Sequence, residues 1–301
     1  MAFTMHSHSG QFCPGHAVDQ LEDIVRHAVS LGYKTMGLTE HMPRYEERDL
    51  YPDERAEPQA SLAALAARHE AYLAEAQRLR DKYADRVTIL VGFEAEFIRP
   101  AYGPRVRALA APAAVDYFIG SVHHVHGLPI DYDGDAYAAA ARAAGGDDER
   151  LAEDYYDLQR DMLEALAPPV VGHFDLVRLL SAAPDADPRR WPGVWDRVCR
   201  NLRLVARQGG WLECNTAALR KGLREPYPGR AIAEEWLRLG GCFTMSDDSH
   251  GIGQLATNYA RGIAYLDSLG VEHVWTLRRR PGPDALEPTK VALAEFRKHF
   301  S

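Results

Sequence analysis

Groups of histidine and carboxylate residues follow short β-rich segments at seven places along this 301-residue chain. The groups are His6-Ser7-His8, Glu40-His41, Glu94-Ala95-Glu96, His123-His124-Val125-His126, His173-Phe174-Asp175, Glu213-Cys214-Asn215 and Ser246-Asp247-Asp248-Ser249-His250. In a barrel of parallel strands, all the carboxyl ends lie on one face, where catalytic sites are built. Residues that are far apart in the sequence are therefore expected to meet in space.

Short apolar segments alternate with helical patterns along the chain. We predict strands over residues 3–8, 34–39, 87–93, 115–122, 170–171, 211–214 and 242–245. We predict helices over residues 18–31, 61–83, 149–166, 194–207, 231–239 and 259–269. This alternation predicts a parallel sheet with helices outside it. Because no Pro-rich or Gly/Ser-rich linker divides the chain, residues 1–301 are predicted to form a single domain, with long loops at 43–60 and 127–148.

Composition narrows the class of protein. A content of 26% charged and 46% hydrophobic residues is ordinary for a soluble globular chain. The net charge of -8 argues against a nucleic-acid partner, which requires a basic surface. No apolar run is long enough to cross a membrane and no signal peptide is visible, so no membrane association is expected. The four cysteines are far apart, which predicts reduced thiols and a cytoplasmic location.

Imidazole and carboxylate groups together suit zinc, iron and manganese. His6 and His8 are two residues apart, so both rings would face the same side of a strand and grip one ion. Glu94 follows an apolar segment, where a buried carboxylate is costly unless cations lie nearby. Taken singly, the pair His6 and His8 is explained by chance, Asp248 by a turn and His173 by a buried core position. Recurrence of the pattern after every predicted strand favours metal binding.

The remaining histidines fall into two sets. His124 and His126 neighbour a predicted ligand and are candidates for a supporting role, for proton donation or for packing. Four others lie outside the groups and are interpreted as surface or packing residues: His27, His69, His273 and His299.

In this order, the motifs resemble the polymerase-and-histidinol-phosphatase (PHP) superfamily of metal-dependent phosphoesterases, and in particular its histidinol-phosphate phosphatase branch. The resemblance rests on residues 6–9, 39–44, 92–96, 120–125, 129–131, 172–175, 215–222 and 246–251. The ordered set is far more specific than any one string, whereas the residues after 251 are less informative. The resemblance implies an α/β fold, a distorted TIM-like barrel of seven parallel strands with helices, (β/α)7.

The resemblance also implies three divalent metal ions, and the sequence does not distinguish among zinc, iron and manganese. The implied ligands of the first ion are His6, His8, Glu94 and Asp248. Glu94 is shared with the second ion, whose other ligands are His123 and His173. The third ion is held by His16, His41 and His250.

The implied activity is a phosphoric monoester hydrolase of histidine biosynthesis, which converts L-histidinol phosphate into L-histidinol and phosphate. We hypothesise that a metal-activated hydroxide attacks phosphorus in line, with inversion and without a phosphoenzyme. The predicted catalytic residues are Asp248, Glu94 and Arg178. Arg178, Arg220 and Lys221 are predicted to contact the phosphate, with salt bridges at the barrel rim as the alternative.

Recognition of the rest of the substrate is less determined. Asn215 and His124 are predicted substrate contacts. The imidazole and the amine need hydrogen-bond acceptors, and Glu40, Asp131 and Glu213 are further candidates that the sequence does not rank. Tyr51, in the first long loop, is a candidate cover for the pocket, and the sequence does not give the oligomeric state.

Three other functions share part of this pattern. A PHP phosphoesterase acting on another small ester or on oligonucleotides would keep the same ligands, although a nuclease should carry a basic groove. An amidohydrolase also begins with His-x-His, but the Asp-x-His at Asp248 and the pair His16 and His41 favour the phosphoesterase. A non-catalytic metal-binding or polymerase-associated module would lack some of the metal ligands, whereas all nine implied ligands are present in this chain.

Overall fold

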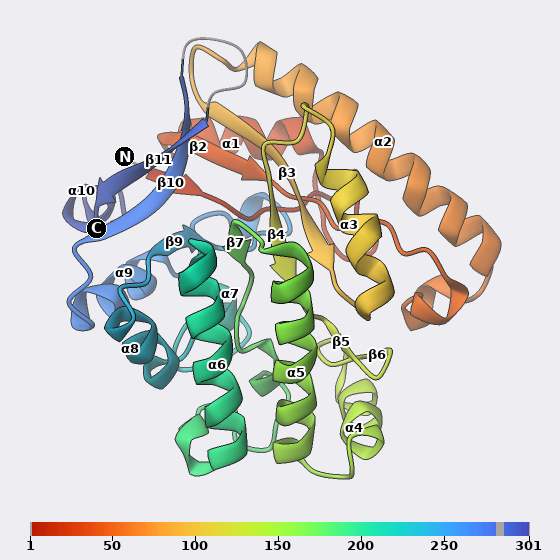
Figure 1. Cartoon of the computed structure of the whole chain (residues 1–301). Helices are drawn as coiled ribbons and strands as arrows, with labels where there is room; N and C mark the ends of the chain where they lie inside the picture. The colour runs from red at the N-terminus through yellow and green to blue at the C-terminus, as the bar shows by residue number, and fades with distance from the viewer. Residues whose placement is uncertain (1, 281–285, 301) are drawn as a thin grey trace.

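Seven parallel strands form the centre of the molecule in the computed structural model, which describes residues 2–280 and 286–300 (Figure 1). Each strand pairs with the next one along the chain. The strands are β1 (Ala2–Thr4), β2 (Tyr33–Leu38), β3 (Thr88–Glu96), β4 (Tyr117–Ser121), β7 (Val170–Val171), β8 (Trp211–Asn215) and β9 (Phe243–Ser246). Because the strands keep chain order and direction, their carboxyl ends gather on one side.

The sheet closes on itself between its first and last strands. The backbone amide of Met5 donates to the carbonyl oxygen of Met245 at 3.1 Å, and the amide of His8 donates to that of Ser249 at 2.8 Å. Ser7 and Ser249 also form a parallel bridge. Met5, His8 and Ser249 lie beyond the ends of β1 and β9, and only Met245 lies within β9, so the closure is irregular and the barrel is distorted. The predicted seven-stranded α/β barrel is confirmed.

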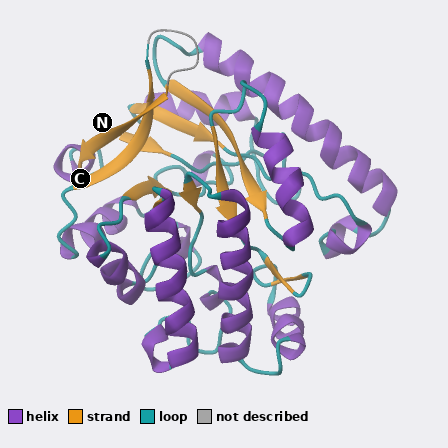
Figure 2. Cartoon of the chain, viewed as in Figure 1, coloured by secondary structure: helices purple, strands orange, loops and turns teal. Residues whose placement is uncertain are grey.

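Helices surround the strands (Figure 2). They are α1 (Leu21–Ser30), α2 (Pro58–Lys82), α3 (Gly103–Ala110), α4 (Gly134–Ala143), α5 (Asp148–Leu166), α6 (Pro192–Gln208), α7 (Ala217–Arg220), α8 (Arg230–Arg238), α9 (Tyr259–Ser268) and α10 (Leu293–Arg297). Apolar residues at helical spacing are buried on these helices; α6, for example, buries Val194, Val198 and Leu202. In the described part of the chain, no helix is both long and apolar enough to cross a membrane.

Two predicted strands end three or more residues away from the predicted position. β1 stops at Thr4, so the strand predicted over residues 3–8 is too long. The Thr4 hydroxyl lies 3.4 Å from the amide nitrogen of His6 and 3.2 Å from its carbonyl oxygen, and such local bonds compete with strand pairing. β3 instead runs to Glu96, beyond the predicted end at residue 93. Glu94 and Glu96 therefore belong to the strand and share one face.

Several elements were not predicted. The loop predicted over residues 127–148 contains α4, whose first turn is capped by Asp133 accepting from the amide of Ala136 at 2.8 Å. The chain also forms α3 and two antiparallel hairpins, β5 (His124–Val125) with β6 (Leu128–Pro129), and β10 (His273–Arg279) with β11 (Leu286–Ala292). β10 packs against β9, β2 and β3, and Arg279 pairs with Asp116 at 2.6 Å, next to the amino end of β4.

Candidate metal centre

Eight of the nine predicted metal ligands meet at the carboxyl ends of the strands. Within the described ranges they form three groups, in each of which the candidate ligand atoms lie within 4.8 Å of one another. The groups are His6, His8 and Asp248; Glu94, His123 and His173; and His8, His41 and His250. His8 belongs to two groups, and its Nε2 lies 3.5 Å from Oε2 of Glu94 in the remaining group, so the three lie next to one another.

Glu94 lies between these groups, and its two oxygens face different sides. Oε1 is 2.9 Å from Nε2 of His173 and 3.3 Å from Nε2 of His123. Oε2 is 3.3 Å from Nε2 of His6 and 3.0 Å from Nδ1 of His41. Burial would raise the pKa of Glu94, but the surrounding imidazoles hold it well below its ordinary value. Glu94 is thus an anion placed to be shared by two cations.

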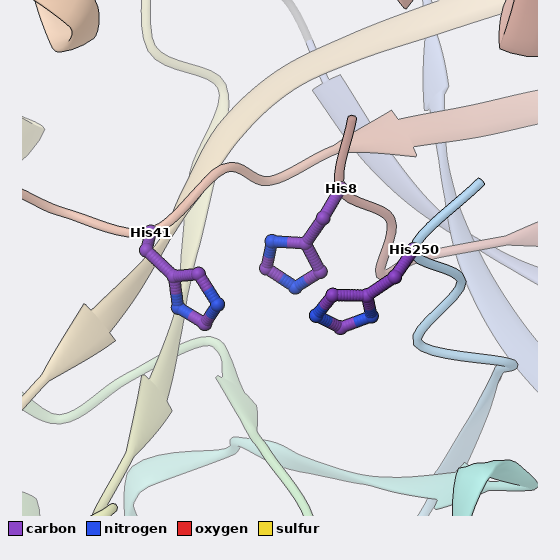
Figure 3. Close-up of side chains that lie close together, drawn as sticks. All are labelled: His8, His41 and His250. Atoms are coloured by element: carbon purple, nitrogen blue, oxygen red, sulfur yellow. The ribbon is translucent and has the colours of Figure 1, made fainter. Parts of the chain in front are cut away.

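The third group consists of imidazoles alone, and Figure 3 shows the rings of His8, His41 and His250 turned toward a common space. The ring of His8 is 4.3 Å from that of His41 and 4.4 Å from that of His250, between centroids. The ring of His16 lies beside them, 4.5 Å from His250 and 5.8 Å from His41. These positions group His8, rather than the predicted His16, with the other two. His16 remains a predicted ligand at the edge of this group.

The buried ring nitrogens fit metal ions. Nε2 of His6, of His8 and of His250 is buried and has no hydrogen-bond partner. A buried polar atom without a partner costs about 1–3 kcal/mol, and a buried carboxylate such as Glu94 or Asp248 costs more unless a cation is near. Imidazole and carboxylate are also the donors that zinc, iron and manganese accept. The donor set therefore suits divalent cations.

Glu213 lies behind these ligands and holds two of them in place. Its Oε2 is 3.0 Å from Nδ1 of His6 and accepts from the Ser246 hydroxyl at 2.7 Å. Its Oε1 accepts from the backbone amide of His173 at 2.6 Å and from Nδ2 of Asn215 at 2.8 Å. A proton on Nδ1 of His6 leaves Nε2 as the ligand atom. From the sequence, Glu213 was only an unranked candidate for substrate contact. The available signal was its place in the group Glu213-Cys214-Asn215 at the end of a predicted strand.

Arg220 fixes the backbone of the segment that carries Asp248. Asp248 has a φ of 47°, in the left-handed region that asparagine and aspartate tolerate better than most residues. Arg220 donates to the carbonyl oxygens of Asp247 and Asp248, each at 2.9 Å. Nδ1 of His250 lies 2.9 Å from the carbonyl oxygen of Asp248. Arg220 therefore orders the backbone that presents two ligands, whereas the sequence predicted a phosphate contact.

Comparison with known proteins decides the family. The PHP domain family matches residues 4–217 of this chain. The chain belongs to the PHP family. A relative from Schizosaccharomyces pombe named a probable histidinol-phosphatase is 38% identical, covering 94% of this chain and 91% of its own. The histidinol-phosphatase of Saccharomyces cerevisiae is 31% identical, with coverages of 95% and 94%.

Solved structures agree on the PHP fold. A Listeria monocytogenes structure has a TM-score of 0.75 at 24% identity and covers 86% of this chain and 99% of its own. A Lactococcus lactis histidinol phosphate phosphatase, solved with zinc, L-histidinol and phosphate, has a TM-score of 0.66 at 19% identity, with coverages of 91% and 96%. At these identities the similarity establishes only the barrel fold. The bound zinc, L-histidinol and phosphate are properties of the Lactococcus lactis protein.

A cavity of about 210 Å³ opens beside the metal-ligand groups of this PHP protein. Lys221 and Asp131 line it together with His16 and Glu94. Tyr51, from the predicted loop 43–60, also lines the cavity and stacks on Tyr132 at 5.7 Å between ring centroids. The interpretation of Tyr51 as a cover agrees with this position.

Arg44 anchors that loop to the strands. Its guanidinium pairs with Glu96 at 3.1 Å and with Glu54 in the loop. The pairing leaves Glu96 matched by a cation of the protein, whereas Glu94 faces only imidazoles. Because Glu96 is already paired with an arginine, Glu94 is the better candidate for the metal ligand shared by two ions. Arg44 lies in one of the motifs that carry the family resemblance, residues 39–44, but no role was predicted for it from the sequence.

Arg178 makes its hydrogen bonds within the protein, outside the lining of this cavity. Its Nε donates to Asp175 at 2.8 Å, and its other nitrogens donate to the carbonyl oxygens of Pro184 at 3.2 Å and Pro226 at 2.9 Å. Its guanidinium sits over the ring of Tyr227, 5.1 Å from the centroid. The structure does not bring Arg178 to the lining of the cavity. A phosphate contact would require these bonds to be exchanged, so that role stays a prediction.

The histidines outside the ligand groups take different positions. His124 is buried behind the cavity, 5.1 Å from the ring of Tyr51, and burial lowers its pKa to about 4. His126 points outward and bonds to Asp154 at 2.7 Å. His69, interpreted as a surface or packing residue, is buried on α2 and lines the cavity.

Proposed function

We propose that this protein is a histidinol-phosphatase, which hydrolyses L-histidinol phosphate to L-histidinol and phosphate in histidine biosynthesis. The observation that carries the proposal is Glu94, whose two carboxylate oxygens face separate groups of buried imidazoles beside one cavity. The kinship with proteins named histidinol-phosphatases, at 38% and 31% identity over nearly full length, selects the substrate.

The three ligand groups would hold three divalent cations, of zinc, iron or manganese. Such ions polarise a phosphoryl oxygen and lower the pKa of a bound water toward about 7. The chain's own part is to place the donors. Glu94 and Asp248 supply the anionic ligands, and Glu213 keeps the ring of His6 in one tautomer and one orientation.

Lys221 supplies a cation of the protein at the same cavity. Its ammonium group has no hydrogen bond or ion pair with any described residue, and it is exposed at the lining. An unpaired ammonium group beside the metal ligands attracts a phosphate dianion and orients it. Among the three predicted phosphate contacts, Lys221 is the one that the proposal retains as a direct contact, because Arg220 and Arg178 are engaged with backbone carbonyl oxygens.

We also propose a single domain and a cytoplasmic location. One hydrophobic core extends from Phe3 to Phe296, which supports one folding unit. All four cysteines are free thiols, which supports a reducing compartment. Cell fractionation tests the location, and a single cooperative unfolding transition is expected for one domain.

The test of the function is a substrate panel assayed with metal-loaded protein. Phosphate release is measured from L-histidinol phosphate, 4-nitrophenyl phosphate, a mononucleotide and a dinucleotide. The proposal predicts that kcat/KM is highest for L-histidinol phosphate by at least about tenfold. Equal turnover of all monoesters would indicate a general phosphatase, and preference for the dinucleotide would indicate a nuclease.

A further inference from the structure

Three of the four acceptors considered for the substrate's cationic groups are already engaged within the protein. Glu213 receives hydrogen bonds on both oxygens. The side-chain oxygen of Asn215 accepts from the amide of Ala217 at 2.9 Å. Oε1 of Glu40 accepts from the amide and hydroxyl of Ser9 at 2.8 and 2.5 Å, and its buried Oε2 lies 3.9 Å from Nδ1 of His8. Glu213 and Asn215 therefore have no free acceptor oxygen, and the one free oxygen of Glu40 is fully buried beside the predicted metal ligand His8.

Asp131 differs from them in each respect. It lines the cavity, is only partly buried, and makes no hydrogen bond or ion pair with any residue that the structure describes. Two of the predicted metal ligands, His123 and Glu94, line the same cavity. Asp131 is therefore a carboxylate next to the metal centre without a partner.

The backbone on both sides of Asp131 is fixed. Ile130 is fully buried, and its amide donates to the carbonyl oxygen of His123 at 2.9 Å. On the other side, Tyr132 stacks on Tyr51 of the covering loop. A side chain held between two such anchors is positioned before a ligand arrives, so little ordering free energy opposes binding.

We propose that the Asp131 carboxylate binds the ammonium group of the substrate and makes the enzyme selective for amine-bearing phosphate monoesters. The inference rests on the proposed function and extends it to a specificity residue. Asp131 and Lys221 line the same cavity, one with a carboxylate and the other with an ammonium group, and neither side chain is paired with a described residue. A molecule with a phosphate at one end and an ammonium group at the other matches both charges, whereas an alkyl phosphate without an ammonium group leaves Asp131 unpaired.

The test compares Asp131→Asn with the wild type on three substrates. They are L-histidinol phosphate, its analogue without the amine, 3-(imidazol-4-yl)propyl phosphate, and 4-nitrophenyl phosphate. Loss of a charge-assisted bond predicts a fall of about tenfold or more in kcat/KM for L-histidinol phosphate, chiefly through KM. The other two substrates should change less than about twofold. Asp131→Glu should restore part of the loss, and Asp135→Asn, an exposed neighbour on α4, should change nothing.

Each other pattern contradicts the inference. Loss on both alkyl esters with 4-nitrophenyl phosphate spared would make Asp131 a proton donor to the leaving alcohol, because nitrophenolate needs no proton. Equal loss on all three would make it a positioning residue of the metal centre, and no loss would exclude contact. A wild type without preference for L-histidinol phosphate over the generic esters contradicts the proposed function itself. A selective wild type with an unaffected Asp131→Asn contradicts only the role of Asp131.

Discussion

Glu213 Oε2 lies 3.0 Å from Nδ1 of His6, on the side of the ring opposite to Glu94. This carboxylate–histidine pair leaves Nε2 of His6, which has no hydrogen-bond partner, directed at Glu94 and the other candidate ligands. Carboxylates in such positions orient the ring and raise its basicity as a ligand. The metal affinity of the centre should therefore depend on a residue that touches no metal.

Glu213→Gln should weaken metal binding about tenfold to a hundredfold. The amide has one acceptor oxygen where the carboxylate has two, so the bonds to His6 and to the His173 amide cannot both be kept. Activity is measured as a function of free zinc or manganese, and excess metal should restore much of it. Glu234→Gln, at an exposed position of α8, is the matched control. An unchanged metal dependence would remove Glu213 from the supporting role.

Glu94→Ala should cost more bound metal than the loss of one histidine. Glu94 faces two sides of the centre, whereas His123 belongs to one group. Elemental analysis after dialysis is expected to show a larger drop in ions per chain for Glu94→Ala than for His123→Ala. His126→Ala, at an outward-facing residue, should keep the full complement. Equal drops for Glu94 and His123 would contradict a shared ligand.

Arg220→Ala and Lys221→Ala should fail in different ways although the residues are adjacent. Arg220 bonds to the carbonyl oxygens of Asp247 and Asp248, so its loss should reduce metal content and kcat. Lys221 lines the cavity without a partner, so its loss should raise KM about tenfold at unchanged metal content. Kinetics and elemental analysis on the same preparations separate the two. A normal metal content in Arg220→Ala would overturn its assignment.

His69 predicts a pH-dependent stability. Burial lowers its pKa from 6.5 to about 4, and both ring nitrogens lack partners beside Tyr72 and Phe93. Because the unfolded chain binds this proton more readily, the contribution of His69 to stability is complete above about pH 6.5 and is lost as the pH falls toward 4. The free energy of unfolding of His69→Leu, relative to that of the wild type, should therefore be higher at pH 5 than at pH 7.5, by up to about 2 kcal/mol. Thermal unfolding at the two pH values measures the difference, and a pH-independent difference would contradict it.

The barrel and most of the ligand set could be predicted because both depend on repeated local patterns. Apolar segments followed by His, Glu or Asp mark the carboxyl ends of strands, and the structure brings those of Glu94, His173 and Asp248 together. The limits of β1 and β3 could not be predicted, since the side chain of Thr4 competes with strand pairing and Glu94 is stabilised inside the strand by distant histidines. Contacts between residues far apart in the sequence cannot be recognised from the local sequence pattern.

Roles that depend on which partner a side chain finds were also beyond the sequence. Arg178 and Arg220 have the chemistry of phosphate contacts, but backbone carbonyl oxygens of neighbouring segments occupy them. Glu213 and Asp131 looked alike as acceptors, and only the contacts separate a saturated carboxylate from an unpaired one. The hairpin of β10 and β11 carries no motif, and its position is set by packing against β9 and β2.

The most direct test of the account is a metal titration of metal-free protein with L-histidinol phosphate hydrolysis as the readout. Zinc or manganese is added stepwise, and bound ions per chain and phosphate release are measured on the same samples. The account predicts no turnover without metal and full turnover only as occupancy approaches three ions per chain. Full turnover in chelator, or at a single ion per chain, would contradict a centre in which Glu94 joins the ligand groups.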